Sequence, residues 1–243
     1  MKTRICLVIF CVAVTCSAAT AAQTVVVTSK KVTYTRPKPI ADFKKNFTVN
    51  HPKVKAASKS VSEKIEAALS YDKAFGITVA DELREAQWLE EADFRVLLNR
   101  KGVLCVELSI QGTGAYPSGN TKRIVVDSRT GKRALPGEVF IYINGLVDMV
   151  TKLQKKEIAD AIAEIKANKD WDEPNPERLF DTASFRMDNL KGYSIDEQGV
   201  TFYYDYGFPH VIQAMQPDGE YKFTWAQMKP FIRIGSLLER MTR

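Results

Sequence analysis

The chain has 243 residues, of which 45% are hydrophobic and 26% are charged. These fractions are close to the averages of folded globular proteins and exclude an intrinsically disordered chain. The formal net charge is +6, but the basic residues alternate with acidic or apolar ones. This pattern favours solvated surfaces over a patch for nucleic acid, so we expect no nucleic-acid partner.

Residues 1–22 have the pattern of a cleavable export signal. Lys2 and Arg4 form a positive start, the run at 5–14 is apolar, and small residues offer a cleavage site just before Gln23. The apolar run is shorter than the roughly 20 residues that span a bilayer. We therefore expect an exported protein, periplasmic or extracellular, whose only membrane contact is this leader before its cleavage.

Three of the four cysteines lie in the leader, so cleavage leaves only Cys105. A single cysteine cannot form an intramolecular disulfide, and the mature chain must be stabilised by an ordinary apolar core. Cys16 follows a poor lipid-attachment sequence, and we do not expect a lipid anchor. Cys105 lies inside an apolar run and is predicted to be a buried, unreactive thiol.

The spacing of apolar residues predicts both helices and strands, without the regular alternation of parallel βαβ units. In chain order the predicted elements are strands at 24–27 and 31–35, helices at 54–69 and 79–86, a hairpin of strands 93–98 and 103–111, a strand at 122–127, a helix at 143–166, a loop at 172–176, strands at 185–188, 193–196, 200–206 and 221–225, and a helix at 226–232. The predicted fold class is α+β, with antiparallel sheets packed against a few helices in two adjoining subdomains.

Five residues are predicted to contact a ligand. The segment 112–120 is expected to be a turn that presents Tyr116 beside Pro117, a common composition for contact surfaces. The aromatic strand at 200–206 sends alternate side chains to opposite faces, so that one face should be core and the other partly exposed. The predicted ligand-binding residues are Tyr116, Pro117, Tyr203, Tyr206 and His210.

Two blocks of residues carry a family resemblance. The first is Gly114-Ala115-Tyr116-Pro117, followed by a strand and by the segment 127–132. The second is the segment 199–204, then Pro209-His210, then 221–230. In their order and spacing these blocks resemble the RsiV/PdaC-like extracytoplasmic domain pair.

The resemblance implies a bacterial protein from a family of largely unknown function, with an N-terminal domain at 23–142 and a C-terminal domain at 143–243. The anti-sigma-factor members of that family carry a membrane-spanning helix, and their outer part is a receptor for lysozyme. Its deacetylase members add a separate catalytic domain. We expect neither addition here. The resemblance then implies a non-catalytic binding module of the cell envelope, whose ligand is a lysozyme-like hydrolase or peptidoglycan.

Two other classes of function stay open at this point. One is a hydrolase centred on His210, with Ser118 and Asp205 as candidate partners, although no nucleophile-elbow motif supports them. The other is a structural or assembly protein of the envelope, in which exposed tyrosines form an oligomer interface. The only other histidine, His51, also lacks a spaced metal-ligating partner, so we predict no catalytic residue, no metal and no cofactor.

The leader generates a first prediction. The full chain, expressed in a bacterial host, should leave the cytosol and begin near Ala22 or Gln23. N-terminal sequencing and intact mass measurement of the exported material check this. Recovery of the final product in the cytosol with Met1 still attached would contradict the export signal.

Overall fold

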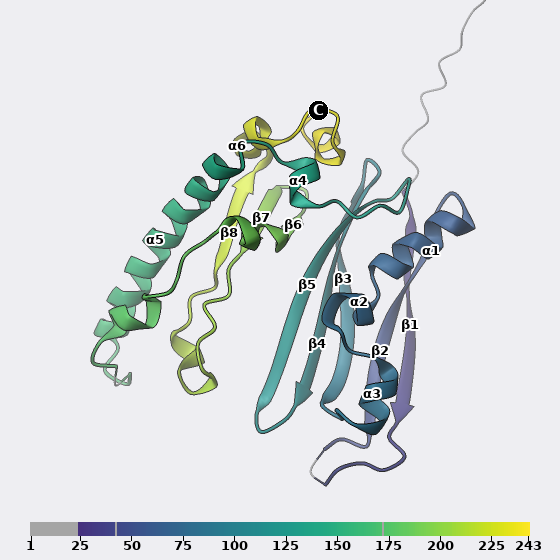
Figure 1. Cartoon of the computed structure of the whole chain (residues 1–243), viewed down its shortest axis with the longest axis horizontal. Coiled ribbons are helices and arrows are strands. Elements are labelled where there is room, and N and C mark those ends of the chain that lie inside the picture. The colour runs from purple at the N-terminus through teal and green to yellow at the C-terminus, as the bar shows by residue number, and fades with distance from the viewer. Residues whose placement is uncertain (1–23, 42, 172) are drawn as a thin grey trace, which may run out of the picture.

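The computed structural model describes residues 24–41, 43–171 and 173–243 (Figure 1). The predicted leader at 1–22 lies outside these ranges. The described residues form a five-stranded sheet with the order β1-β2-β3-β4-β5 and a three-stranded sheet with the order β6-β7-β8. Helices pack against both sheets, so the predicted α+β class is confirmed. No helix within these ranges has the length and apolar character needed to cross a bilayer.

Neighbouring strands of the first sheet are antiparallel except β2 and β3, which are parallel because three helices cross over between them. The bounds are β1 (Val26–Thr35), β2 (Asn46–Lys55), α1 (Lys59–Ala68), α2 (Tyr71–Phe75), α3 (Val79–Arg84), β3 (Leu89–Arg100), β4 (Val103–Thr113) and β5 (Pro117–Asp127). The two predicted strands at the N-terminal end of this region are thus one continuous strand, β1.

The predicted hairpin is confirmed as β3 and β4. Its turn is Lys101-Gly102, where both residues have positive φ, 51° and 76°, as the tight turns of two-residue hairpins require. The turn predicted at 112–120 is shorter than expected, because most of these residues belong to strands. Pairing between β4 and β5 continues as far as Thr113 and Pro117, so that only the tip of this second hairpin is unpaired.

The helix predicted at 54–69 is confirmed as α1, but its predicted start is wrong. Val54 belongs to β2, where it pairs with Val27, and α1 begins only at Lys59. Ser58 sets that start, because its side chain accepts a hydrogen bond from the backbone N–H of Val61 as an N-cap.

Pro52 is the reason that β2 escaped prediction, since proline normally argues against a strand interior. The proline is tolerated because β2 pairs with β3 only at Thr48 and Val49, and Pro52 lies beyond that short ladder. At this point β2 has only β1 as a neighbour, and Pro52 pairs with Ser29.

The second half of the chain consists of a long helix, a small sheet and several short helical segments. Their bounds are α4 (Pro136–Val139), α5 (Ile143–Ala167), η1 (Pro176–Phe180), η2 (Met187–Lys191), β6 (Tyr193–Ile195), β7 (Gly199–Tyr203), η3 (His210–Met215), β8 (Glu220–Thr224), α6 (Trp225–Met228), η4 (Lys229–Phe231) and η5 (Leu237–Met241). Helix α5 matches the predicted helix at 143–166, because its apolar residues recur with the helical period and bury Leu146 and Val150.

The strand predicted at 185–188 is wrong. The backbone N–H of Phe185 donates to Oε1 of Gln154 on α5, at 2.8 Å, and not to a neighbouring strand. The chain then forms the 3-10 helix η2 before it enters β6. Phe185 is apolar because its ring is buried in the core, where it packs against Phe202.

Helices α1–α3 cover one face of the first sheet (Figure 1). Side chains of β4 alternate between the two faces of the sheet, and on this side Leu104 and Leu108 are fully buried. The core under the helices also includes Phe47, Val49, Ile65, Leu69, Ala92, Ile124 and Val126.

The opposite face of the first sheet packs against the second half of the chain over part of its length only. Val103, Cys105 and Val125 of the first sheet share one core with Phe140 and Phe202. Ile195 N–H donates to the Cys105 sulfur at 3.5 Å, which joins β6 to β4 across the junction. The two halves of the chain are therefore held together by a continuous apolar core.

A buried ion pair anchors the loop that follows β1. Arg36 is 1% exposed, and its guanidinium lies 3.1 Å from the carboxylate of Glu82 on α3. The same guanidinium donates to the carbonyl of Leu89 at 2.7 Å, and the backbone N–H of Leu89 donates to Glu82 at 2.8 Å. The pair thus fixes α3 against the start of β3.

Removal of one partner of this pair should be costly. We expect Arg36→Ala to lower the free energy of unfolding by about 3–5 kcal/mol, because Glu82 would be left buried without its counter-charge. The matched control is Lys59→Ala, which removes an exposed pair with Glu63 and should cost about 0.5 kcal/mol or less. Urea unfolding of both variants measures the difference, and equal losses would contradict the assigned role of Arg36.

Burial raises the pKa of the Cys105 thiol to about 12. Folding therefore favours the neutral thiol, and this contribution to stability is complete below the ordinary thiol pKa of about 8.5. It should be lost as the pH rises from there towards 12, at roughly 1.4 kcal/mol per pH unit. The measurement is the free energy of unfolding of the wild type and of Cys105→Ala at several pH values in this range. The difference between the two proteins isolates the contribution of the Cys105 thiol, because all other groups titrate equally in both. A stability difference that does not change with pH would refute it.

Candidate binding cleft

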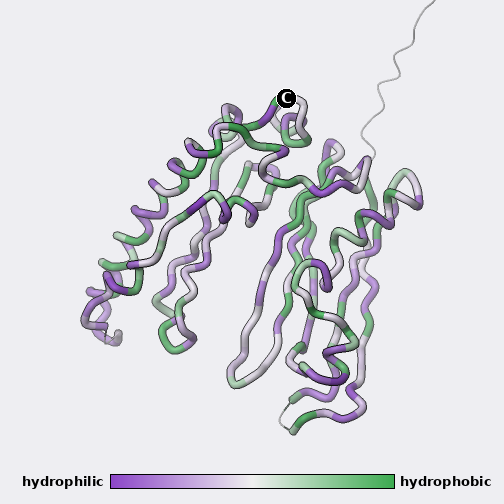
Figure 2. Tube along the Cα trace, viewed as in Figure 1, coloured by the Kyte–Doolittle hydropathy of each residue, from purple (hydrophilic) through white to green (hydrophobic). Residues whose placement is uncertain are grey.

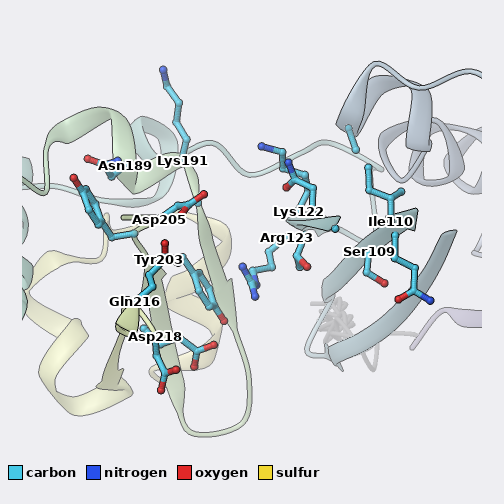
Figure 3. A pocket seen from close by; sticks show the side chains of 18 of the residues that line it. Ser109, Ile110, Lys122, Arg123, Asn189, Lys191, Tyr203, Asp205, Gln216 and Asp218 are labelled. Atoms are coloured by element: carbon cyan, nitrogen blue, oxygen red, sulfur yellow. The ribbon is translucent and has the colours of Figure 1, made fainter. Parts of the chain in front are cut away.

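A cleft of about 1080 Å³ lies between the first sheet and the second half of the chain (Figure 3). One wall is formed by β3, β4 and β5, and the other by residues from η2, β7, η3 and β8. Its lining is largely polar and includes Glu91, Asp93, Ser109, Gln111, Thr121, Lys122, Arg123, Arg133, Asp188, Asn189, Lys191, Tyr203, Tyr204, Asp205, Gln213, Gln216, Asp218 and Glu220.

The first wall arises because one face of β4 changes from apolar to polar residues along the strand. Val103 and Cys105 are buried under the second half of the chain, whereas Glu107, Ser109 and Gln111 on the same face are partly or fully exposed. Figure 2 shows the corresponding change along β5, where hydrophobic residues near its C-terminal end give way to more polar ones towards the hairpin tip. The core therefore ends where the cleft begins.

Side chains on this wall form cross-strand rows. Glu107 accepts hydrogen bonds from Arg95 of β3 at 3.0 Å and from Arg123 of β5 at 2.9 Å. In a row nearer the tip, the Gln111 amide donates to Glu91 at 2.9 Å. These contacts keep the charged side chains extended over the sheet and leave the wall flat and polar.

The second wall is built from irregular segments on either side of β7 and β8. Asp205 follows β7 and accepts a hydrogen bond from Gly207 N–H at 2.8 Å, at a turn where Gly207 has φ of 67°. Asp218 lies in the turn before β8, next to Gly219. A Cβ on Gly219 would lie 1.9 Å from the carbonyl oxygen of Tyr204, so only glycine lets these two segments approach.

At its inner end the cleft is crossed by a cation–π contact. The Arg123 guanidinium lies 3.5 Å from the centre of the Tyr203 ring, and the Tyr203 hydroxyl is 2.8 Å from the Ser194 hydroxyl. Burial raises the pKa of Tyr203, an effect that Ser194 and Arg123 only partly oppose. Tyr203 is therefore a neutral ring fixed between the two walls.

At its outer end the two halves of the chain meet again. The ring of Tyr116, at the tip of the β4–β5 hairpin, stacks on the ring of His210 in η3 with 4.8 Å between centroids and 19° between planes. Both side chains are exposed, Tyr116 by 58%. The hairpin tip thus touches the second half of the chain directly.

The structure brings some of the predicted ligand-binding residues together and separates others. Tyr116 and His210 are in contact, Pro117 follows at the exposed start of β5, and Tyr203 lines the cleft. Tyr206 lies outside the cleft lining. Its hydroxyl donates to Glu157 of α5 at 2.8 Å, and its ring packs in a separate small core. Their roles in binding stay predictions.

The candidate partners of His210 do not assemble around it. Within the described part of the chain no hydrogen bond joins His210 to Ser118 or Asp205. Ser118 instead accepts a hydrogen bond from the Trp88 indole at 3.2 Å, and Asp205 is engaged with Gly207.

The other histidine, His51, lies 3.3 Å from the Tyr34 hydroxyl on the helix-covered face of the sheet. Burial, with the nearby Lys53 and Lys30, lowers its pKa. In the residues that the structure describes, no group of three or more His, Cys, Asp or Glu side chains is arranged to hold a metal ion.

Sequence reasoning missed most of the charged residues of the cleft, among them Asp93, Arg123, Lys191 and Asp218. The one available signal was the change from apolar to polar residues on the Cys105 face of β4. The facing wall comes from segments far away in the sequence, and no local pattern indicates that they lie opposite.

The sequence matches no protein-family model and no curated protein. Its fold is similar to that of a DUF3298 family member from Bacteroides fragilis NCTC 9343, with a TM-score of 0.58 and 16% identity over 91% of this chain and 98% of that one. It is also similar to a DUF3298 family protein from Pseudomonas aeruginosa PAO1, with a TM-score of 0.55 and 14% identity over 88% of this chain and 96% of that one. The chain therefore shares its fold with proteins of a family whose function is unknown.

Arg123 and Arg95 provide a matched test of the contact across the cleft, since both pair with Glu107. The Arg123 side chain is 18% exposed and also covers Tyr203, whereas the Arg95 side chain is 72% exposed. We expect Arg123→Ala to cost about 1–2 kcal/mol of unfolding free energy and Arg95→Ala to cost about 0–1 kcal/mol. Denaturant unfolding measures both, and a larger loss for Arg95→Ala would refute the assignment.

Proposed function

We propose that the protein is an exported, non-catalytic binding module of the bacterial cell envelope that holds its ligand in the cleft between the two sheets. The ligand class is a lysozyme-like hydrolase or the wall glycan, peptidoglycan. The observation that carries this proposal is the cleft itself, which is large, open along the first sheet and lined from both halves of the chain by charged and amide side chains.

The chemistry of the lining favours a polar, extended ligand over a small apolar one. Small-molecule sites are usually lined by hydrophobic and aromatic side chains with a few polar groups, and this cleft has the reverse composition. Hydroxyl, amide and charged groups of a glycan or of a protein surface can form hydrogen bonds with Asp93, Asn189 and Asp218. The neutral Tyr203 ring adds an apolar surface at the inner end.

The paired charges in the cleft support ligand recognition. Arg123 is paired with Glu107, and Lys191 is paired with Asp188 at 2.8 Å. The paired cations present hydrogen-bond donors to a ligand in the cleft. This supports recognition as the role of the cleft.

The envelope setting rests on two further observations. The leader pattern at 1–22 indicates export, and the shared fold with DUF3298 proteins fits a family of unknown function. The finer assignment, to the RsiV/PdaC-like domain pair, is part of this proposal and is supported by the two blocks of residues that carry the resemblance.

Calorimetric titration of the purified protein with a lysozyme and with soluble peptidoglycan fragments tests the proposal. At least one of the two probes should bind. Asp218→Lys reverses a charge on the cleft wall and should weaken that binding by about 1 kcal/mol, roughly fivefold. The control is Asp148→Lys, the same change at an exposed position on α5 outside the cleft lining, which should leave the affinity unchanged.

Two results would overturn the proposal. One is the absence of binding to both probes. The other is binding that Asp218→Lys and Asp148→Lys weaken equally, since this would place the ligand outside the cleft.

A further inference from the structure

Strand β5 is an edge of the first sheet, and part of this edge is already paired. The segment that follows β5 turns back, and Arg133 forms an antiparallel bridge with Val126. Asp127 N–H donates to the carbonyl of Lys132 at 2.8 Å, and Ala134 N–H donates to the carbonyl of Val125 at 2.8 Å. The chain then leaves the edge and enters α4, so that the remainder of β5 is not covered by this segment.

The hydrogen-bond pattern identifies the groups of β5 that point away from the sheet. Thr113 N–H donates to the carbonyl of Trp88, which lies on the β3 side of β4. The backbone groups of Thr113 therefore point away from β5, and the pair of Thr113 with Pro117 is a non-hydrogen-bonded pair of the β4–β5 ladder. In antiparallel ladders bonded and non-bonded pairs alternate. Every second residue of β5 therefore has its backbone N–H and C=O directed away from β4. These residues are Gly119, Thr121, Arg123, Val125 and Asp127.

The bonds already made at Val125 and Asp127 confirm this assignment. Among the residues that the structure describes, no backbone partner is found for the outward groups of Gly119, Thr121 and Arg123. These three residues form an open stretch of sheet edge, which at about 3.4 Å per residue is roughly 14 Å long.

This open edge borders the cleft. All five consecutive residues from Gly119 to Arg123 line it. Side chains alternate between the two faces of a strand. Because residues from both faces of this stretch line the cleft, the cleft must extend along the edge of β5 itself. Figure 1 shows β5 as the strand of the first sheet nearest the second sheet, whereas β1, the other edge, lies on the far side. In the middle of β1, Lys30 and Lys31 discourage strand addition.

The two faces beside the edge differ in chemistry. On the helix side, a groove of about 430 Å³ next to Gly119 and Asn120 contains the half-buried rings of Phe75 and Trp88. On the cleft side, the facing wall carries the exposed carboxylates of Asp205 and Asp218. A strand added to β5 would send alternate side chains to these two environments.

We propose that the cleft binds an extended peptide segment, which adds to β5 as a sixth strand in line with residues 132–134 and alternates apolar with basic or polar side chains. This inference rests on the proposed function, because it specifies how the cleft of a binding module recognises its ligand. Backbone hydrogen bonds to Gly119, Thr121 and Arg123 supply affinity, while Phe75, Trp88 and Asp218 select the side chains.

The test uses a random-peptide phage library selected on the purified protein, with counter-selection on Thr121→Pro. Proline at this position removes one outward N–H and is compatible with an edge strand, since no ladder bond uses that N–H. Enriched peptides should alternate apolar and basic residues, bind Thr121→Pro about tenfold more weakly than the wild type, and bind Thr121→Ala with unchanged affinity because it keeps the N–H.

Hydrogen exchange provides a second measurement on the wild-type protein, which does not depend on the folding of a variant. Without peptide, the amides of Gly119, Thr121 and Arg123 should exchange quickly, and those of Asn120 and Lys122 slowly. An enriched peptide should protect the first three and leave the other two as they were. Uniform protection of all five, or no change in them, would overturn strand addition.

The outcomes separate this inference from the proposed function. If no peptide prefers the wild type, but peptidoglycan fragments bind and Asp218→Lys weakens their binding, strand addition is refuted and the binding module stands. If peptides, lysozyme and peptidoglycan fragments all fail to bind, both proposals fall.

Discussion

The partial burial of the second face of the first sheet is the constraint on which the rest of the structure depends. Around Cys105 and Val125 this face is covered by Phe140, Phe202 and their neighbours, and the two halves of the chain become one body. The covering sheet has short strands, of three to five residues, whereas β4 and β5 each have eleven. The uncovered remainder of the long strands has to be polar, because it faces water, and it becomes the wall of the cleft.

The same mismatch in length leaves part of a sheet edge open, and open edges invite unwanted pairing. The chain itself protects the half of β5 near the core through residues 132–134. Along residues 119–123 of β5, the second half of the chain faces the edge across the cleft and does not pair with it. The contacts of Arg123 with Tyr203 and of Tyr116 with His210 join the two walls at separate points. This geometry restricts access to the edge without occupying it, which is compatible with the proposed addition of a peptide strand.

Some elements of the fold could be predicted from the sequence and others could not. The period of the apolar residues predicted α5, and the change to a period of two predicted the β3–β4 hairpin. Both are local patterns that burial of one face enforces. The pattern failed at β2, where Pro52 argues against a strand but lies beyond the ladder with β3. It failed again at Phe185, whose apolar character serves the core and not a strand. Of the residues that line the cleft, Tyr203 was predicted as a ligand contact from its aromatic strand, whereas Arg123 and Asp218 were not predicted.

The sequence by itself determined the α+β class, the long helix and the change from apolar to polar residues along one face of β4. These features follow from neighbouring residues that share a face, and such information is present in any short window of the chain. Only the tertiary structure decided which segments lie opposite that polar face and which edge of the sheet is open. These facts come from contacts such as Cys105 with Ile195, which are 90 residues apart. Contacts of that kind are fixed by the packing of the whole core, which no single stretch of the sequence contains.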